Sequence, residues 1–475
     1  MKKPMAKNGR KPGGRKPAKP AGPAQPKVRA SLELTDNPRL AAFRALKETG
    51  EGRLPEEALE SHCRLLSPRD LGLTTAIVYE VLRHQSLLNG LIRARLTSGR
   101  ASDDLMLILR LGLAQLMFFS RLGDHAVVME TVALAKAVAP GRHGLVNAVL
   151  RGLIRDREAG LPWPPEIPET GDLVRDLAML YSYQPWLVKM LLRDYNQEEA
   201  ELLLASGNRH TPPTIRANPL KIGRAALAMN TSFPCSPTDL SPWGLTVEGF
   251  FGQPAEWPGF SEGLFAIQDE ASQLAGLLAG NLGRAEVLDA CAGLGGKGLS
   301  LACLNPEAAI TCLDKDPAKL DSLKREAERL GCSENVRTES RDLTAEPLPQ
   351  AAYDLVLVDA PCSGLGVIRR RPDLKWSKGE DDITRLAGLQ QRLLLATADS
   401  VRPGGRLIFG VCSFSREEGP ENVKKFLSAR PDFAAAPPAA WPESLQPLLA
   451  DDHTLTLLPH RQNTDGFFWA VFFKN

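Results

Sequence analysis

Between Asn37 and Arg157, apolar residues recur at the three- and four-residue spacing of α-helices. One apolar face is formed by Ile108, Leu109, Gly112, Leu113 and Leu116, and another by Val146, Val149, Leu150, Leu153 and Ile154. Strand-like alternation is nearly absent from this part of the chain. The pattern predicts a compact all-helical domain over residues 35–160.

The pattern changes at a proline-rich stretch. Leu161 to Thr170 contains four prolines in ten residues, which favours an extended linker, predicted over residues 161–171. A helical pair is expected over 172–206. Short apolar runs then alternate with turn residues, as at Thr214 to Ala217 and Gly244 to Val247. Residues 172–260 are therefore predicted to form two helices and a small α+β subdomain.

The last part of the chain, residues 261–475, alternates short apolar runs with helix-length amphipathic stretches such as Ala318 to Leu330. The runs are Val287 to Ala290, Ile310 to Leu313, Leu355 to Val358 and Leu407 to Val411. This order is typical of a parallel, doubly wound, Rossmann-like α/β sheet. Because ligands bind outside the carboxyl ends of such strands, the residues there are the candidates for function.

Charge is distributed unevenly. The chain has 475 residues and a formal net charge of +2, but residues 1–30 contain ten basic residues, six prolines and no acid, so the remainder carries −8. Residues 1–34 are expected to be a disordered basic tail, serving either RNA binding or solubility. No apolar window suits a membrane span and no secretory signal is visible. Eight cysteines without a CxxC pair argue against disulfides and zinc, so a reduced, cytoplasmic setting without a bound metal is expected. The protein is also expected to be a monomer.

A glycine-rich loop follows the first predicted strand, and it matches GxGxxG at Gly293, Gly295 and Gly298. Asp314 ends the next strand 21 residues after Gly293, a spacing suited to binding ribose hydroxyls. The loop is not a P-loop, because Cys291 replaces the first glycine and Lys297 precedes another glycine. A dinucleotide, another adenosine cofactor and a tight turn without any ligand all remain open.

Two cysteines also lie at predicted strand ends. Cys362 belongs to the sequence DAPCSG, which begins at Asp359, and Cys412 directly follows the run that ends at Val411. Both should lie on the edge that carries the glycine loop, where a deprotonated thiol could act as a nucleophile. The other cysteines of this part are expected to be structural: Cys303, Cys312 and Cys332.

These motifs resemble the RsmB/Sun group of bacterial 16S ribosomal RNA cytosine-5-methyltransferases, within the NOL/NOP/Sun family. The similar segments include VLDACAGLGGK (287–297), DLVLVDAPCSGLGVIRRRPDLKW (354–376) and RLIFGVCSFSREEGPENV (406–423). The helical domain is similar to the antitermination factor NusB through segments such as LVNAVLRGLI (145–154). The family usually has AAPGGK in its first loop, where this chain has Leu294 in place of proline.

The resemblance implies S-adenosylmethionine as cofactor and a base-modifying role for the cysteines. Cys412 would be the nucleophile that adds to carbon six of cytosine, Cys362 would assist product release, and Asp359 would hydrogen-bond the base. The implied cofactor-binding residues are Cys291, Ala292, Gly293, Leu294, Gly295, Gly296, Lys297, Asp314, Asp342 and Asp359.

Ribosomal RNA is the implied partner, possibly within a partly assembled particle, and its target base must be unpaired or flipped. Arg369 and Arg370, followed by Arg371, are candidate phosphate contacts, or else form a solvated basic turn. Arg216 and Asn218 are candidate RNA contacts or ordinary strand-surface residues. Two further functions stay open. One is a non-catalytic RNA-binding assembly factor, and the other is a nicotinamide-dependent oxidoreductase suggested by GxGxxG alone.

Overall fold

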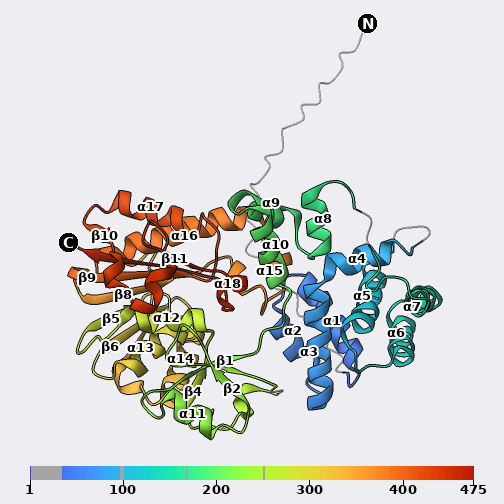
Figure 1. The fold of residues 1–475 in the computed structure, drawn as a ribbon, viewed down its shortest axis with the longest axis horizontal. Helices are drawn as coiled ribbons and strands as arrows, with labels where there is room; N and C mark the ends of the chain where they lie inside the picture. Colours follow the sequence, from blue (N-terminus) through green and yellow to red (C-terminus); the bar gives the residue numbers. More distant parts are fainter. Residues whose placement is uncertain (2–34, 97–100, 167–168, 250–251) are drawn as a thin grey trace.

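A computed structural model describes residue 1 and residues 35–96, 101–166, 169–249 and 252–475. The predicted basic tail lies almost wholly outside these residues. The described chain forms a helical part, a small sheet and a larger α/β part, arranged side by side (Figure 1). Three helices of the middle region lie between the helical part and the α/β part.

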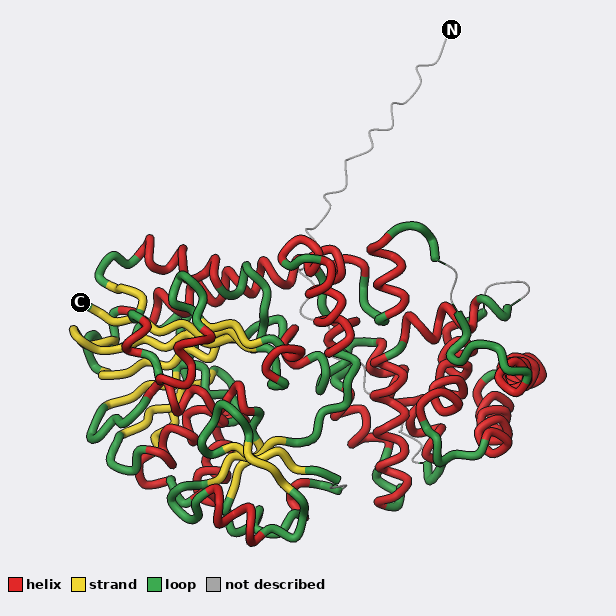
Figure 2. The backbone as a smooth tube through the Cα atoms, in the orientation of Figure 1, coloured by secondary structure: helices red, strands yellow, loops and turns green. Residues whose placement is uncertain are grey.

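The N-terminal part contains helices and no strands among its described residues (Figure 2). Its elements are α1 (Pro38–Gly50), α2 (Pro55–His62), α3 (Pro68–Arg83), α4 (Gln85–Arg93), α5 (Asp103–Phe118), α6 (Asp124–Val138) and α7 (His143–Glu158). Proline at the first position favours the start of α1, α2 and α3. A Cβ added to Gly112 would lie 2.8 Å from Leu150, so this glycine allows α5 to pack closely against α7.

The middle region has three helices where the sequence predicted a pair: α8 (Leu173–Leu180), α9 (Pro185–Asp194) and α10 (Gln197–Ser206). An antiparallel sheet of order β2-β3-β1-β4 follows. It comprises β1 (Thr214–Ala217), β2 (Cys235–Pro237), β3 (Gly244–Val247) and β4 (Phe265–Ile267), with α11 (Arg224–Asn230). Aromatic side chains fill its core, where the ring centroids of Phe233 and Trp257 lie 5.6 Å apart.

The large sheet has the order β10-β12-β9-β8-β5-β6-β7, with β11 paired to β12. Its strands are β5 (Glu286–Asp289), β6 (Ala309–Asp314), β7 (Val336–Ser340), β8 (Tyr353–Asp359), β9 (Val401–Val411), β10 (Phe433–Ala435), β11 (Leu455–Leu457) and β12 (Phe467–Lys474). Strands β5 to β9 are parallel, as the four apolar runs predicted. The sheet as a whole is mixed, because β12 runs antiparallel to β9.

Helices cover both faces of this sheet. One apolar core includes residues of α12 (Glu270–Ala279), α13 (Gly296–Leu304) and α14 (Pro317–Leu330). The opposite core includes residues of α16 (Glu380–Ala398) and α17 (Pro420–Ala429). This two-layered covering explains why the central strands are apolar on both faces.

Residues 369–378, here called the junction segment, connect the α/β part to the helical parts and include α15 (Leu374–Ser377). The side-chain nitrogen of Lys375 is buried, donates to the carbonyl of Arg83 at 3.0 Å, and lies 3.9 Å from the ring centroid of Tyr183. The indole of Trp376 donates to the carbonyl of Leu82 at 2.6 Å. The junction segment begins seven residues after Cys362, so the loop with the first strand-end cysteine also contacts the N-terminal helices.

Candidate active site

The two strand-end cysteines meet. Strands β8 and β9 are parallel neighbours, with Asp359 opposite Gly410, so the loops that follow them leave the same edge of the sheet. The Sγ atoms of Cys362 and Cys412 lie 3.0 Å apart and both thiols are free. The hydrogen bond to Cys412, together with burial, raises the pKa of Cys362 well above its usual value. Cys362 therefore keeps its proton.

Backbone contacts fix the separation of these loops. The N–H of Gly366 donates to the carbonyl of Cys412 at 3.0 Å, and the N–H of Gly466 donates to the carbonyl of Gly366 at 2.8 Å. A Cβ on Gly366 would lie 1.8 Å from the carbonyl oxygen of Gly466. Only glycine permits this approach, so residue 366 contributes directly to the geometry of the cysteine pair.

Asp359 is held by a lysine whose side chain the sequence analysis did not assign. Lys297 lies in the first turn of α13, and its Nζ is 2.6 Å from Oδ2 of Asp359 and 4.9 Å from the ring centroid of Phe467. Burial acts to lower the pKa of Lys297, but the nearby charges of Asp359, Cys412 and Asp289 raise it overall. A protonated lysine therefore lies directly beside the predicted base-binding carboxylate. Its position directly after the glycines was the available signal.

The glycine loop adopts the backbone geometry that its composition suggested. Gly293 and Gly295 have φ values of +56° and +90°. The N–H of Gly293 donates to Asp314 at 3.0 Å, which joins the loop to the end of β6. A Cβ on Gly293 would meet no atom within 4 Å, whereas one on Gly295 would lie 2.6 Å from Leu323. The loop is thus packed against the protein at Gly295 and open at Gly293, beside a carboxylate that suits ribose hydroxyls.

The other predicted cofactor contacts are spread along this edge. Burial raises the pKa of Cys291 well above its usual value, so this thiol stays protonated and only its backbone suits a ligand. Leu294, the family's proline position, has 65% of its surface exposed. Asp342 is exposed two residues beyond β7, where it accepts hydrogen bonds from the backbone and hydroxyl of Thr344. An adenosine moiety could reach Asp314 and Asp342 from the same side of the sheet.

A further carboxyl group lies beneath the loop. Asp289, the last residue of β5, is 1% exposed, and the backbone of Cys291 and Gly298 only partly offsets the burial of its carboxyl group. Burial, followed by repulsion from Asp359, raises the pKa of Asp289 to about 7. A Cβ on Gly298 would lie 2.8 Å from Oδ2 of Asp289, so the glycine leaves room for this carboxyl group.

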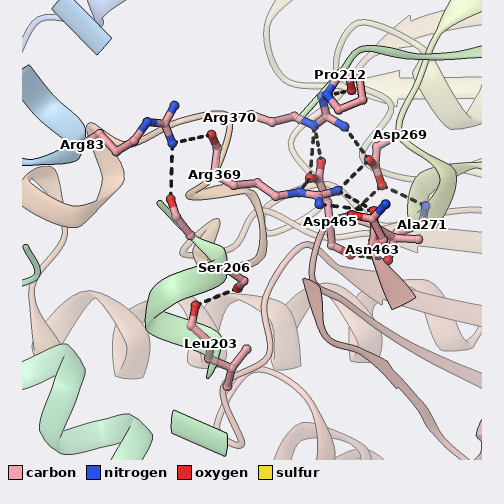
Figure 3. Close-up of polar contacts among 12 residues, drawn as sticks. Arg83, Leu203, Ser206, Pro212, Asp269, Ala271, Arg369, Arg370, Asn463 and Asp465 are labelled. Carbon is pink, nitrogen blue, oxygen red and sulfur yellow. Dashed lines mark hydrogen bonds and ion pairs between the residues drawn. The ribbon is translucent and has the colours of Figure 1, made fainter. Parts of the chain in front are cut away.

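The structure buries two of the four arginines that were candidate RNA contacts. Arg369 is only 4% exposed, and its guanidinium pairs with Asp465 at 2.6 Å and with Asp269 at 3.4 Å (Figure 3). Arg216 is 1% exposed and donates to Gln268 at 2.8 Å. Buried guanidinium groups cannot reach phosphates at the surface. Both arginines therefore stabilise the fold. Arg369 joins the junction segment to Asp269, just before α12, and to Asp465, just before β12.

Arg370 is the third of these arginines and stays partly exposed. It shares the same two carboxylates, at 2.8 Å from Asp269 and 3.0 Å from Asp465 (Figure 3). Its RNA contact remains a prediction. Asn218, the other candidate on the small sheet, is buried and donates to the carbonyls of Gly263 and Leu330, so it too has a structural position.

Within the described ranges, no cluster of His, Cys, Asp and Glu side chains could hold a metal ion. None of the helices formed by the described residues is long and apolar enough to cross a membrane.

Fold and site together define a Rossmann-like methyltransferase with an N-terminal NusB domain. Residues 278–473 match the family described as 16S rRNA methyltransferase RsmB/F, and residues 36–155 match the NusB family. The chain is 33% identical over 420 residues to the Bacillus subtilis protein named "Probable ribosomal RNA small subunit methyltransferase B", covering 85% of this chain and 90% of that one. It is 33% identical over 452 residues to the Vibrio cholerae ribosomal RNA small subunit methyltransferase B, covering 92% and 98%.

The chain therefore belongs to the ribosomal RNA small subunit methyltransferase B family, which confirms the resemblance and the predicted cofactor, S-adenosylmethionine. A solved structure, that of PH0851, has the same fold. It superimposes with a TM-score of 0.74 at 24% identity, covering 93% of this chain and 99% of that one.

Proposed function

We propose that this protein methylates carbon five of a cytosine in small-subunit ribosomal RNA, through a covalent bond between Cys412 and carbon six of the base. The observation that carries the proposal is the pair of free thiols, 3.0 Å apart, at the ends of adjacent strands. An RNA methyltransferase acting on an exocyclic oxygen or nitrogen has no need for two cysteines. Carbon five of cytosine is a poor nucleophile, so its methylation first requires a nucleophile such as a cysteine thiolate to add to carbon six.

The first step is the addition of the Cys412 thiolate to carbon six, which moves electron density onto carbon five. The protonated thiol of Cys362 lies 3.0 Å from the Cys412 sulfur and would donate toward it during the addition. Asp359 would hold the ring nitrogen and amino group of the base, and Lys297 orients this carboxylate through their 2.6 Å contact.

When bound, S-adenosylmethionine supplies an electrophilic methyl group. The residues that fit it are the open backbone at Gly293, the carboxylate of Asp314 and, farther along the edge, Asp342. Once carbon five carries the methyl group, its proton passes to solvent water. The electron pair of that C–H bond re-forms the double bond between carbons five and six, and the bond from carbon six to the Cys412 sulfur breaks. The sulfur leaves as a thiolate and the aromatic ring is restored. Cys362 lies beside this bond and would assist its release.

The target base must leave its helix to reach this edge, so an unpaired or flipped cytosine is expected. Two experiments test the function. Cys412→Ala should retain RNA and S-adenosylmethionine binding but transfer no methyl group to 16S RNA in vitro. Bisulfite sequencing of ribosomal RNA from cells with and without the gene should reveal one cytosine whose protection depends on it. Full methyl transfer by Cys412→Ala would overturn the covalent mechanism.

A further inference from the structure

A buried carboxylate links the two cysteine loops. Glu418 lies in the turn between Cys412 and α17 and is fully buried. Its two oxygens accept five hydrogen bonds. The donors are the Ser363 N–H at 2.8 Å, the Gln390 amide at 3.0 Å, the Ser413 hydroxyl at 2.6 Å, the Ser415 hydroxyl at 3.2 Å and the Ser363 hydroxyl.

Two of the serine donors lie directly beside the cysteines of the proposed reaction. Ser363 directly follows Cys362, and Ser413 directly follows Cys412. Their hydroxyl oxygens lie 3.1 Å apart, and both bond the same carboxylate oxygen. One side chain therefore determines the positions of both residues that come directly after the cysteines.

The charge of Glu418 acts on the nearby thiol of Cys362. No cation forms an ion pair with it within the part of the chain that the structure describes, so hydrogen bonds alone stabilise the carboxylate. Its negative charge is among the causes that raise the pKa of Cys362, after the contact with Cys412 and burial. Glu418 is thus suited to keep Cys362 protonated and leave Cys412 as the nucleophile.

We propose that Glu418 is a positioning residue that holds the two cysteine loops in register and distinguishes the roles of their thiols. This inference rests on the proposed function, because it assumes that Cys412 and Cys362 carry out the reaction. Helices α16 and α17 support the carboxylate from behind. Asn422 donates to the carbonyl oxygen of the Gln390 side chain at 2.9 Å, and the Gln390 amide donates to both Glu418 and the carbonyl of Pro361.

The decisive variant is Glu418→Gln, which keeps the shape of the side chain and removes its charge. The glutamine oxygen can still accept from the Ser363 N–H and the Gln390 amide. Its amide nitrogen would face the three serine hydroxyls, which must turn from donating to accepting. The variant therefore reverses the hydrogen bonds at the two residues that follow the cysteines and removes the charge. The matched control is Glu417→Gln, one residue earlier, where the carboxylate forms a surface ion pair with Arg193.

Cysteine reactivity is measured without RNA, by mass spectrometry of full-length protein treated with iodoacetamide at about pH 8, near the usual thiol pKa. The unchanged protein and Glu417→Gln should be alkylated faster at Cys412 than at Cys362. Glu418→Gln should reduce this ratio severalfold. Its kcat for RNA methylation should fall by about tenfold to a hundredfold with KM values nearly unchanged, the expected effect of misplacing reacting groups. Glu418→Asp, which keeps the charge, should recover part of both.

Ser363→Ala and Ser413→Ala each remove one hydroxyl donor and serve if Glu418→Gln does not fold. Each should lower the reactivity ratio and kcat in the same direction by a smaller factor. If Glu418→Gln, or both serine variants in its place, keep the ratio and kcat of the unchanged protein, the positioning role is wrong. Methylation by Cys412→Ala would instead refute the proposed function, while the alkylation ratio would still report on Glu418.

Discussion

Lys297 and Asp359 form a 2.6 Å ion pair that joins the cofactor loop to the predicted base-binding carboxylate. Lys297→Met keeps the aliphatic chain against Phe467 but removes the charge. Asp359 would then lose its cation and the contact that orients it. We expect kcat to fall about tenfold to a hundredfold, the effect of losing one charged hydrogen bond.

Steady-state RNA methylation with calorimetric measurement of S-adenosylmethionine binding checks this prediction. Lys315→Met, just beyond β6, provides a lysine control near the cofactor loop. Unchanged kcat in Lys297→Met would mean that the ion pair contributes to folding alone.

Cys362→Ala should accumulate a covalent complex between protein and RNA. The variant retains Cys412 for the addition step but lacks the thiol that we expect to assist elimination. Denaturing gel electrophoresis with labelled RNA and S-adenosylmethionine would detect the complex. Cys235→Ala, in β2 of the small sheet, should turn over normally, and adding Cys412→Ala to Cys362→Ala should abolish the complex. A complex that survives this second change must involve another nucleophile.

Asp289→Asn should stabilise the protein in a pH-dependent manner. The folded protein raises the pKa of Asp289 from 3.8 to about 7, so the native state binds the proton more tightly than the unfolded chain. Stability from this group is complete below about pH 4 and is lost as the pH rises toward 7. Asparagine cannot ionise, so the free energy of unfolding should rise by about 1 to 4 kcal/mol at neutral and higher pH.

Urea unfolding at about pH 4 and pH 8 measures this difference. The control is Asp321→Asn on α14, whose side chain is 63% exposed and whose effect should be small at both values. A gain of equal size at low and high pH would show that ionisation of Asp289 is not its cause.

Gly366→Ala should destabilise the protein by about 3 kcal/mol or more, because the new Cβ would overlap the carbonyl of Gly466 and neither backbone can move freely. Gly388→Ala is the comparison. This glycine lies within α16 with space for a Cβ, and alanine should stabilise the helix by up to about 1 kcal/mol. Thermal unfolding distinguishes the two, and equal melting temperatures would contradict the close contact at Gly366.

The sequence alone was sufficient to predict that the main candidate residues lie at one edge of the large sheet. Apolar runs in parallel strands place their following residues together, so Asp359, Cys362 and Cys412 could be expected near the glycine loop before any coordinates. These are local signals, because each residue directly follows its own strand. The antiparallel strand β12 was not predicted, since an apolar run alone does not reveal the direction of its partner.

Residues that act through distant partners could not be found in this way. The contacts of Glu418 with Ser363 and of Lys297 with Asp359 span 55 and 62 positions. Arg369 was expected at the surface because its charge was visible and Asp465, 96 positions away, was not recognisable as its partner. A charged residue in a sequence does not reveal whether water or a carboxylate surrounds it.

The junction segment also has a thermodynamic consequence. A fragment that begins after α7 would leave Lys375 without the carbonyl of Arg83 and Trp376 without the carbonyl of Leu82. Each hydrogen bond lost to water removes about 0.5 to 1.5 kcal/mol, so the catalytic part would lose stability when separated from the N-terminal helices. Unfolding of the intact chain should therefore be more cooperative than its division into three parts suggests.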